Sequence, residues 1–411
     1  MPLADEASAA PVEIFQRGSL RGTEGFFRAG QDAAGRWWLI DPAGKPFFVR
    51  CVHGVKAARP HGDGALLPDS AARLRAWGFN AIGVGGDEGV GRDDGWPFMA
   101  AVDFCAAGRL ISVGGLHLPD VFDPEFPRLA AERALAVCAG WIGSRELIGW
   151  VTDSRLEWAL MARTGRPSLL QICLSLEPSF PAYHAAWEFA LALHSGRLAA
   201  LARAWDAPIA NKEVVREMTR AEQGLRTRGF LRDEARWARE FARRYFTTTS
   251  AAVRAADPNH LVLGCCFSTE VGAAVLGECV YPAVDVAMPH WAELPPPGAK
   301  PSHPVLAGDV SWVDEDFLRP QAGGRASRLT SVERMLRRAR MALERLGRHP
   351  AVVGYAWSRW EDEPGERAPF ARGLVHADGT EAPEHTELLA QFNGRVEALR
   401  RGVTQESITA A

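Results

Sequence analysis

Leu261-Val-Leu-Gly-Cys-Cys-Phe267 is an uninterrupted apolar run, and it follows a long helical pattern over residues 233–256. Its length and its flanks predict a strand that is buried on both faces. A helix that leads into such a strand is the repeating unit of a parallel sheet, because the helix returns the chain to the starting edge of the sheet. This stretch therefore predicts an α/β fold.

The same unit recurs along the chain. A strand is predicted at 45–53, and further apolar runs lie at 79–85, 110–113, 147–153, 284–288, 305–309 and 352–357. Together with the run at 261–267 they make about eight strands, the count of a (β/α)8 TIM barrel. An open doubly wound sheet is the alternative. No Gly-x-Gly-x-x-Gly follows a first strand and opens a helix, so a dinucleotide site is not supported.

The ends of the chain and one long connection suggest how the barrel is elaborated. Arg36-Trp-Trp-Leu-Ile-Asp41 and the strand at 45–53 flank a Pro-Ala-Gly turn, which predicts an N-terminal β-hairpin at 26–50. Residues 154–260 are too many for one connection, so we predict a helical insertion after strand 4. We thus expect an N-terminal extension at 1–25, a barrel over 26–400 and a flexible tail at 401–411.

Composition narrows the class of protein. The 411 residues carry 47 Lys and Arg against 50 Asp and Glu, a net charge of −3, which argues against a general nucleic-acid binder. No apolar run is long enough for a membrane span. The acidic N-terminus lacks a signal-peptide pattern, so we expect a cytoplasmic location, with a trimmed signal as the alternative. The seven cysteines include no Cys-x-x-Cys pair, which favours buried thiols over disulfides or a zinc site.

The informative positions of a barrel are the C-terminal ends of its strands. Carboxylates that face each other across the mouth can cleave a glycosidic bond, one as acid/base and one as nucleophile. The alternative is that each carboxylate caps the next element or pairs with an arginine. The side chains predicted at strand ends are His53, Asp87 or Glu88, Asp153, His290, Trp291, Asp309 and Trp357.

The tryptophan and histidine residues supply further candidates for a carbohydrate-binding site. The chain has 14 Trp residues, which suit either core filling or flat platforms for sugar rings. Trp357 is the leading platform candidate, followed by Trp150, Trp291 and Trp312, although side-chain alternation along a strand makes some of them core residues. His53 and His290 are predicted hydrogen-bond partners of a polar ligand. No His-x-His or His-Glu-x-x-His spacing occurs, so we expect no metal and no other cofactor.

Several linked segments carry a family resemblance. They are Gly35-Arg-Trp-Trp-Leu-Ile-Asp-Pro-Ala-Gly-Lys-Pro-Phe-Phe48, Leu74-Arg-Ala-Trp-Gly-Phe-Asn80, Pro119-Asp-Val-Phe-Asp-Pro-Glu-Phe126, Asp257-Pro-Asn-His-Leu-Val-Leu-Gly-Cys265 and Val353-Gly-Tyr-Ala-Trp357. From about residue 35 to residue 397 the chain resembles the agarase-like glycoside hydrolases of the retaining (β/α)8-barrel clan. The resemblance implies a glutamate acid/base after the fourth strand and a glutamate nucleophile after the seventh.

Both implied positions are altered in this chain. The family pattern Asp-Asn-Glu-Leu is Asp153-Ser-Arg-Leu156 here, so Arg155 stands at the acid/base position. An arginine stays protonated and cannot cycle a proton. The Gly-Glu-Phe pattern is Gly308-Asp-Val310, which places Asp309 as the nucleophile. Asp153 or Glu157 is the alternative acid, and Cys266 replaces an arginine of the fifth-strand motif.

Two hypotheses therefore stand. The protein is a glycoside hydrolase-like enzyme that acts on a glycoside or polysaccharide with a degenerate catalytic pair, or it is a catalytically silent glycan-binding pseudoenzyme in polysaccharide handling. The expected ligand in both cases is a carbohydrate. Arg155 at the mouth predicts a preference for anionic sugars, unless it instead neutralises Asp309. The sequence does not specify an oligomeric state.

Overall fold

The fold is known from a computed structural model. It describes residues 15–57, 69–87, 90, 95–113, 116–154, 156, 168–221, 224–267, 269–295, 302–313, 315–318, 331–366 and 368–402. The predicted acid Glu157, the position Arg155 and the alternative Glu88 lie outside these residues. None of the helices in this part of the chain combines the length and the apolar composition that crossing a membrane requires.

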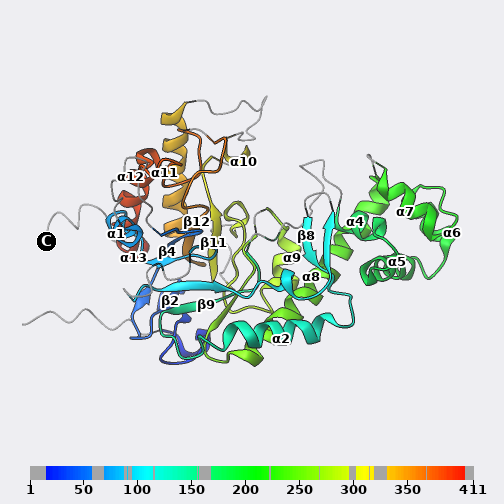
Figure 1. Ribbon diagram of the computed structural model, residues 1–411, viewed down its shortest axis with the longest axis horizontal. Coiled ribbons are helices and arrows are strands. Elements are labelled where there is room, and N and C mark those ends of the chain that lie inside the picture. The colour runs from blue at the N-terminus through cyan, green and yellow to red at the C-terminus, as the bar shows by residue number, and fades with distance from the viewer. Residues whose placement is uncertain are drawn as a thin grey trace, which may run out of the picture.

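A seven-stranded parallel sheet forms the centre of the molecule (Figure 1). Every neighbouring pair of its strands is parallel. In three of them, 147–151, 261–264 and 352–357, every residue is buried, which explains why the sequence shows continuous apolar runs rather than alternation. The order across the sheet is β10 (Leu261–Gly264), β9 (Leu147–Val151), β6 (Phe98–Ala101), β5 (Ala81–Ile82), β4 (Val49–Val52), β12 (Val352–Trp357) and β11 (Val305–Val310).

Residues 284–290 join the two edges of this sheet. The Asp285 amide donates to the Val262 carbonyl of β10 over 2.8 Å. On the other side, the Leu306 amide of β11 donates to the Ala287 carbonyl over 2.8 Å. The apolar run predicted at 284–288 therefore takes the sixth place in the ring. This closure confirms the predicted (β/α)8 TIM barrel.

The third barrel strand is not the one predicted. The run at 110–113 is β7 (Leu110–Val113), which pairs antiparallel with β8 (Leu116–Pro119) in a separate hairpin. The third place belongs to β6. Its four residues are mostly half-buried and too few to stand out as an apolar run. The β7–β8 hairpin instead follows β6 and lies on the side of its C-terminal end.

An N-terminal sheet closes the opposite end of the barrel. It consists of β1 (Arg28–Gln31), β2 (Trp37–Ile40) and β3 (Pro46–Phe47), and the predicted turn links the last two. The Trp37 amide donates to the Pro350 carbonyl just before β12 begins. The buried Asp32 carboxylate accepts from the Trp38 indole over 3.0 Å, and the Arg400 guanidinium lies over that indole. The N-terminal sheet therefore covers the end at which the barrel strands begin, and the C-terminal ends of these strands lie at the opposite end.

Helices cover the outside of the ring, and α4 to α7 extend to one side of it (Figure 1). The 29-residue α8 (Arg228–Ala256) begins at Thr227, whose hydroxyl accepts from the Phe230 amide, and it packs against α2. The other α-helices are α1 (Ser70–Ala76), α2 (Phe126–Cys138), α4 (Leu169–Ser175), α5 (Pro181–Leu193), α6 (Leu198–Trp205), α7 (Lys212–Arg220), α9 (Ala273–Val275), α10 (Glu315–Leu318), α11 (Val332–Arg348), α12 (Pro383–Asn393) and α13 (Val396–Arg401). Four short helical turns are η1 (Arg17–Ser19), η2 (Phe104–Ala106), η3 (Leu276–Val280) and η4 (Trp291–Glu293).

Candidate functional site

Asp309 has the most unusual backbone of the predicted site residues. Its φ is +51°, a left-handed conformation that costs a residue with a Cβ about 1–2 kcal/mol. The pairing of β11 with β12 shifts between Ala307 and Val310, so the strand carries a bulge at this point. The other residues of β11 are buried, whereas Asp309 is half-buried. The bulge therefore turns one carboxylate out of the strand at the C-terminal end of the barrel.

Gly308 makes this turn sterically feasible. A Cβ at Gly308 would lie 3.2 Å from the Met288 and Pro289 carbonyl oxygens and 3.4 Å from the Cys266 sulfur. The two contacts with carbonyl oxygens are closer than Cβ atoms normally come. The glycine thus lets β11 lie against the sixth ring segment immediately before the left-handed residue. A parallel bridge between His290 and Gly308 brings the following residues, Trp291 and Asp309, to neighbouring positions in the ring.

His53 is enclosed after the first barrel strand, and only 5% of it is exposed. Its Nδ1 accepts from the Val84 amide over 3.1 Å, and its Nε2 lies 3.7 Å from the sulfur of Cys266. Both ring nitrogens therefore contact protein groups. The role predicted for His53, a hydrogen bond to a polar ligand, stays a prediction, and in this structure the ring links three elements of the barrel.

Asp153 is also enclosed, at the end of β9, with 2% of its surface exposed. Its carboxylate accepts from the Cys105 amide over 2.8 Å and from the Tyr245 hydroxyl of α8. Burial raises the pKa of Asp153 to about 7, even though both hydrogen bonds favour the charged form. Asp153 thus holds its proton close to neutral pH, but behind Tyr245 and Cys105 rather than open to a ligand.

One group of residues near Asp153 has the donor types of a metal site. Asp103, Cys105 and Asp153 each place one ligand atom within 4.8 Å of the others. The Asp153 carboxylate is already engaged by Cys105 and Tyr245, and burial raises the pKa of the Cys105 thiol far above neutral. The Cys105 thiol also donates to the His117 carbonyl over 3.7 Å, so two of these three donors already have partners within the protein.

The loops after β4 and β5 lie against each other through Asp87. Its carboxylate accepts from the Ala57 amide over 3.0 Å, and its own amide donates to the Val55 carbonyl. A Cβ at Gly86 would lie 2.5 Å from the Val55 carbonyl oxygen. The glycine-rich stretch at 83–86 therefore serves a close approach of two loops, and Asp87 is an exposed residue that ties them together.

The four candidate tryptophans differ in exposure. Trp150, Trp312 and Trp357 are fully buried, whereas Trp291 is partly exposed and stacks on Phe317 with ring centroids 5.4 Å apart. Trp357 packs edge-on against Trp312 at 4.4 Å, and its indole donates to the Arg372 carbonyl. Trp357 stays a predicted sugar platform, and in this structure its indole is fully buried. Trp291 is the indole that the fold leaves partly open beside Asp309.

His290 shapes this corner rather than facing outward. It is 7% exposed, and its Nδ1 accepts from the Ala292 amide over 3.4 Å, which caps η4. This cap holds Trp291 at the first position of the short helix. Tyr245, the partner of Asp153, was not identified from the sequence. Its only signal is its place in the buried stripe of α8, a pattern that every core aromatic shares.

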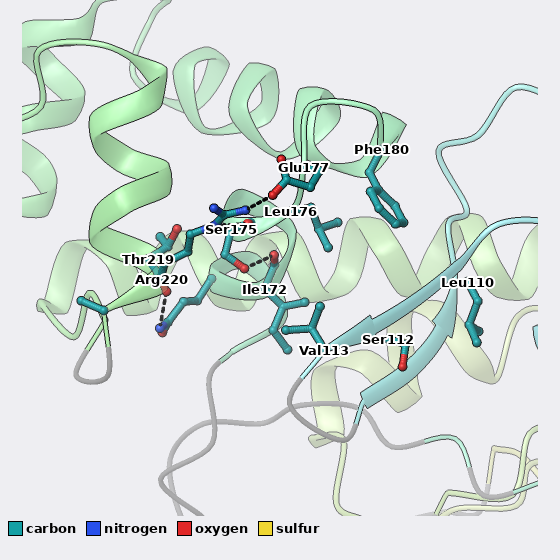
Figure 2. Close-up of a pocket in the computed structure, with 12 residues that line it drawn as sticks. Leu110, Ser112, Val113, Ile172, Ser175, Leu176, Glu177, Phe180, Thr219 and Arg220 are labelled. Atoms are coloured by element: carbon teal, nitrogen blue, oxygen red, sulfur yellow. Dashed lines mark hydrogen bonds and ion pairs between the residues drawn. The ribbon is translucent and has the colours of Figure 1, made fainter.

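A groove lies away from these strand ends, between the β7–β8 hairpin and helices α4 and α7 (Figure 2). Its volume is about 590 Å³, within the usual range for a site that holds a small ligand. Sequence patterns did not reveal it, because its walls come from three separate segments, at 110–113, 171–180 and 219–221.

The ring of parallel strands, with a left-handed aspartate and a partly exposed indole at its C-terminal end, places this chain among the (β/α)8 barrels. No family model matches the chain. It is 23% identical over 318 residues to β-agarase A of Vibrio sp. (strain JT0107), which covers 60% of this chain and 32% of that protein. The chain therefore spans about a third of the length of this curated relative.

Solved structures of agarases are similar to this chain in fold. An exo-β-agarase superimposes with a TM-score of 0.66 at 19% identity, over 94% of this chain and 67% of that one. The agarase AgWH50C gives 0.64 at 18% identity, over 94% and 66%. The structure of BpGH50 gives 0.66 at 16% identity, over 97% and 88%. The agarase-like resemblance is thus confirmed in sequence and in fold.

Proposed function

We propose that this protein acts on or binds a polysaccharide at the C-terminal mouth of the barrel, with Asp309 as the carboxylate that meets the sugar. The observation that carries this proposal is the left-handed backbone at Asp309. Strained residues that the surrounding structure maintains cluster at functional sites. The relative named β-agarase A supports an agar-type galactan as the substrate class.

In the enzymatic form of the proposal, the Asp309 carboxylate attacks the anomeric carbon while a protonated group gives its proton to the departing glycosidic oxygen. Water then cleaves the glycosyl ester, and that group takes a proton back. Asp153 holds a proton near neutral pH, with its pKa at about 7. A partly open Trp291 beside Asp309 supports sugar binding, because an indole face packs against the C–H face of a sugar ring.

The enclosure of Asp153 favours the second candidate function, a catalytically silent glycan-binding protein. A general acid must come within hydrogen-bond reach of the oxygen that it protonates. Asp153 is 2% exposed, and its carboxylate accepts hydrogen bonds from the Tyr245 hydroxyl of α8 and from the Cys105 amide of η2. Arg155, at the position where the resemblance implies the acid, cannot supply this proton.

A substrate screen separates the two forms. Wild type, Asp309→Asn and Arg155→Glu are assayed for turnover and for binding of agarose, agarose oligosaccharides and aryl glycosides, with acidic oligosaccharides as a comparison set. Asp206→Asn is a matched control, since Asp206 shares the left-handed backbone with φ +47° at the end of α6.

Turnover that Asp309→Asn reduces by about a thousandfold or more supports the enzyme. Binding without turnover, weakened by Asp309→Asn alone, supports the silent form, and activity gained in Arg155→Glu shows that a proton donor was missing. Preferential binding of the acidic oligosaccharides supports the predicted role of Arg155. Absence of both binding and turnover across the screen overturns the proposal.

A further inference from the structure

The wall of the groove that β7 forms exposes large apolar side chains to solvent. Leu110 and Val113 on β7 are 37% and 36% exposed, two of the six large apolar side chains in the described residues that reach such exposure. Ile111 between them is fully buried and anchors the strand to the core. Leu110 and Val113 both line the groove, together with Leu176 and Phe180 on its other side (Figure 2).

We propose that this groove, called the hairpin groove below, is a second carbohydrate site that holds a neutral stretch of polysaccharide. The proposal rests on the function proposed above and adds a separate point of attachment for the polymer. Its walls combine apolar side chains with the exposed Ser112, while Gln171 and Thr219 are buried and the Gln171 amide donates to the Thr219 carbonyl over 3.0 Å. Such a surface matches a sugar chain, in which C–H faces alternate with hydroxyl edges.

Charge at the rim indicates a neutral ligand. Of the described residues that line the hairpin groove, Glu177 and Arg220 are the charged ones, and they form an ion pair over 2.6 Å. The Arg220 guanidinium also donates to the Ser175 carbonyl over 2.8 Å. Recognition of a phosphate or carboxylate needs a cation that is not already neutralised. A lipid chain, by contrast, would offer no hydrogen-bond partner to the charged pair or to the serine and threonine hydroxyls of the groove.

The topology places the groove on the same side of the barrel as Asp309. The β7–β8 hairpin follows the C-terminal end of β6, and α4 to α7 follow the C-terminal end of β9. These two strands are neighbours in the ring. Both walls therefore extend from the C-terminal face of the barrel. A polymer long enough to leave the mouth can reach the hairpin groove, whereas a short fragment occupies the mouth alone.

The test compares polymer with fragment on variants of the exposed wall. Leu110→Asp and Val113→Asp place a charge in the groove at exposed positions, and Leu231→Asp is the matched control on α8, where Leu231 is 41% exposed. Binding of soluble agarose and of an agarose tetrasaccharide is measured by affinity electrophoresis and by calorimetry. We expect polymer binding about tenfold weaker in the two groove variants, equal to about 1.4 kcal/mol, with fragment binding unchanged. The control should match wild type in both.

Ser112→Arg, also at an exposed position, fills the groove with a long side chain instead of adding an acidic group. It provides a second test if the aspartate variants fail to fold. Unchanged polymer binding in variants with native circular dichroism overturns the proposal. A wild-type dimer that Leu110→Asp converts to monomer assigns the groove to a second copy instead. Polymer binding that survives Asp309→Asn but falls in Leu110→Asp supports the groove even where the function proposed for the mouth fails.

Discussion

The sulfur of Cys266 lies 3.7 Å from Nε2 of His53, although 213 positions separate the two residues. The Val84 amide donates to Nδ1 of the same ring, so the neutral imidazole carries its proton on Nε2 and directs it at the sulfur. The imidazole is therefore a donor to Cys266 rather than a base that takes its proton. This geometry supports the interpretation of Cys266 as a packed thiol and makes His53 the link between the first, second and fifth strand ends.

Gly83→Ala should break this link. The added Cβ would lie 2.5 Å from Nδ1 of His53 and 2.7 Å from the Val52 carbonyl oxygen, and the backbone atom cannot move aside easily. We expect a loss of about 1–3 kcal/mol in the free energy of unfolding, measured in urea, and a changed His53 ring ¹⁵N spectrum. Gly140→Ala is the control, because its Cβ would meet nothing within 4 Å. Equal stability of the two variants would contradict the proposed contact.

Asp309→Gly should separate stability from function. Glycine adopts a positive φ without strain, so the variant should gain about 1 kcal/mol of unfolding free energy. The same change removes the carboxylate and should abolish sugar binding or turnover. Asp206→Gly, at φ +47°, should gain stability and keep function. A functional Asp309→Gly protein would show that the strained carboxylate has no role at the mouth.

The contribution of Asp153 to stability should fall as pH rises. Its pKa is about 7 in the folded protein against 3.8 ordinarily, so the folded state binds the proton more tightly than the unfolded state. This favourable contribution is fully present below about pH 4 and is lost as pH rises through 7. Urea unfolding of wild type and Asp153→Asn at pH 4.5 and pH 8 measures it as a difference. The stability advantage of wild type over the variant should be smaller at pH 8, and parallel pH dependences would refute the assignment.

His303 should make the protein sensitive to acid. Burial and the nearby Arg21 guanidinium lower the pKa of His303 to about 3, while the unfolded chain protonates it at about 6.5. The unfolded state therefore gains a proton that the folded state refuses, and stability falls as pH drops from about 6.5 toward 3.

At pH 5 this effect amounts to about 2 kcal/mol relative to pH 7.5. His303→Gln keeps an acceptor for Arg21 but has no titrating ring, so its unfolding free energy should fall less over the same range. Chemical denaturation of both proteins at the two pH values checks this, and an identical acid loss would exclude His303 as the source.

Much of the barrel could be predicted because its signal is local. Seven of the predicted runs coincide with ring positions, since continuous apolar stretches arise wherever a strand is covered on both faces. The third strand was missed because Phe98-Met-Ala-Ala101 is short and mostly half-buried. The Asp257-Pro-Asn-His260 segment has one local contact, since the Asp257 carboxylate accepts from the His260 ring over 2.7 Å, and one distant contact, from the Trp150 indole over 2.8 Å.

The candidate site was less accessible from the sequence. Strand ends singled out Asp309 as a candidate, but its left-handed backbone depends on how Gly308 meets the neighbouring segment. The expected roles of His53 and Trp357 depended on exposure, which both residues lack. The hairpin groove has no sequence signal, because its walls meet only when the segments after β6 and β9 fold side by side.

By itself, the order of residues determined the class of fold and the places where chemistry can lie, since the periodicity of apolar side chains and the ends of strands are properties of neighbouring positions. The tertiary structure alone decided which of those side chains remain available. Asp153 is closed off by Tyr245, 92 positions away, and His53 by Cys266, 213 positions away. Burial of this kind is set by packing between distant segments, and no local pattern encodes it.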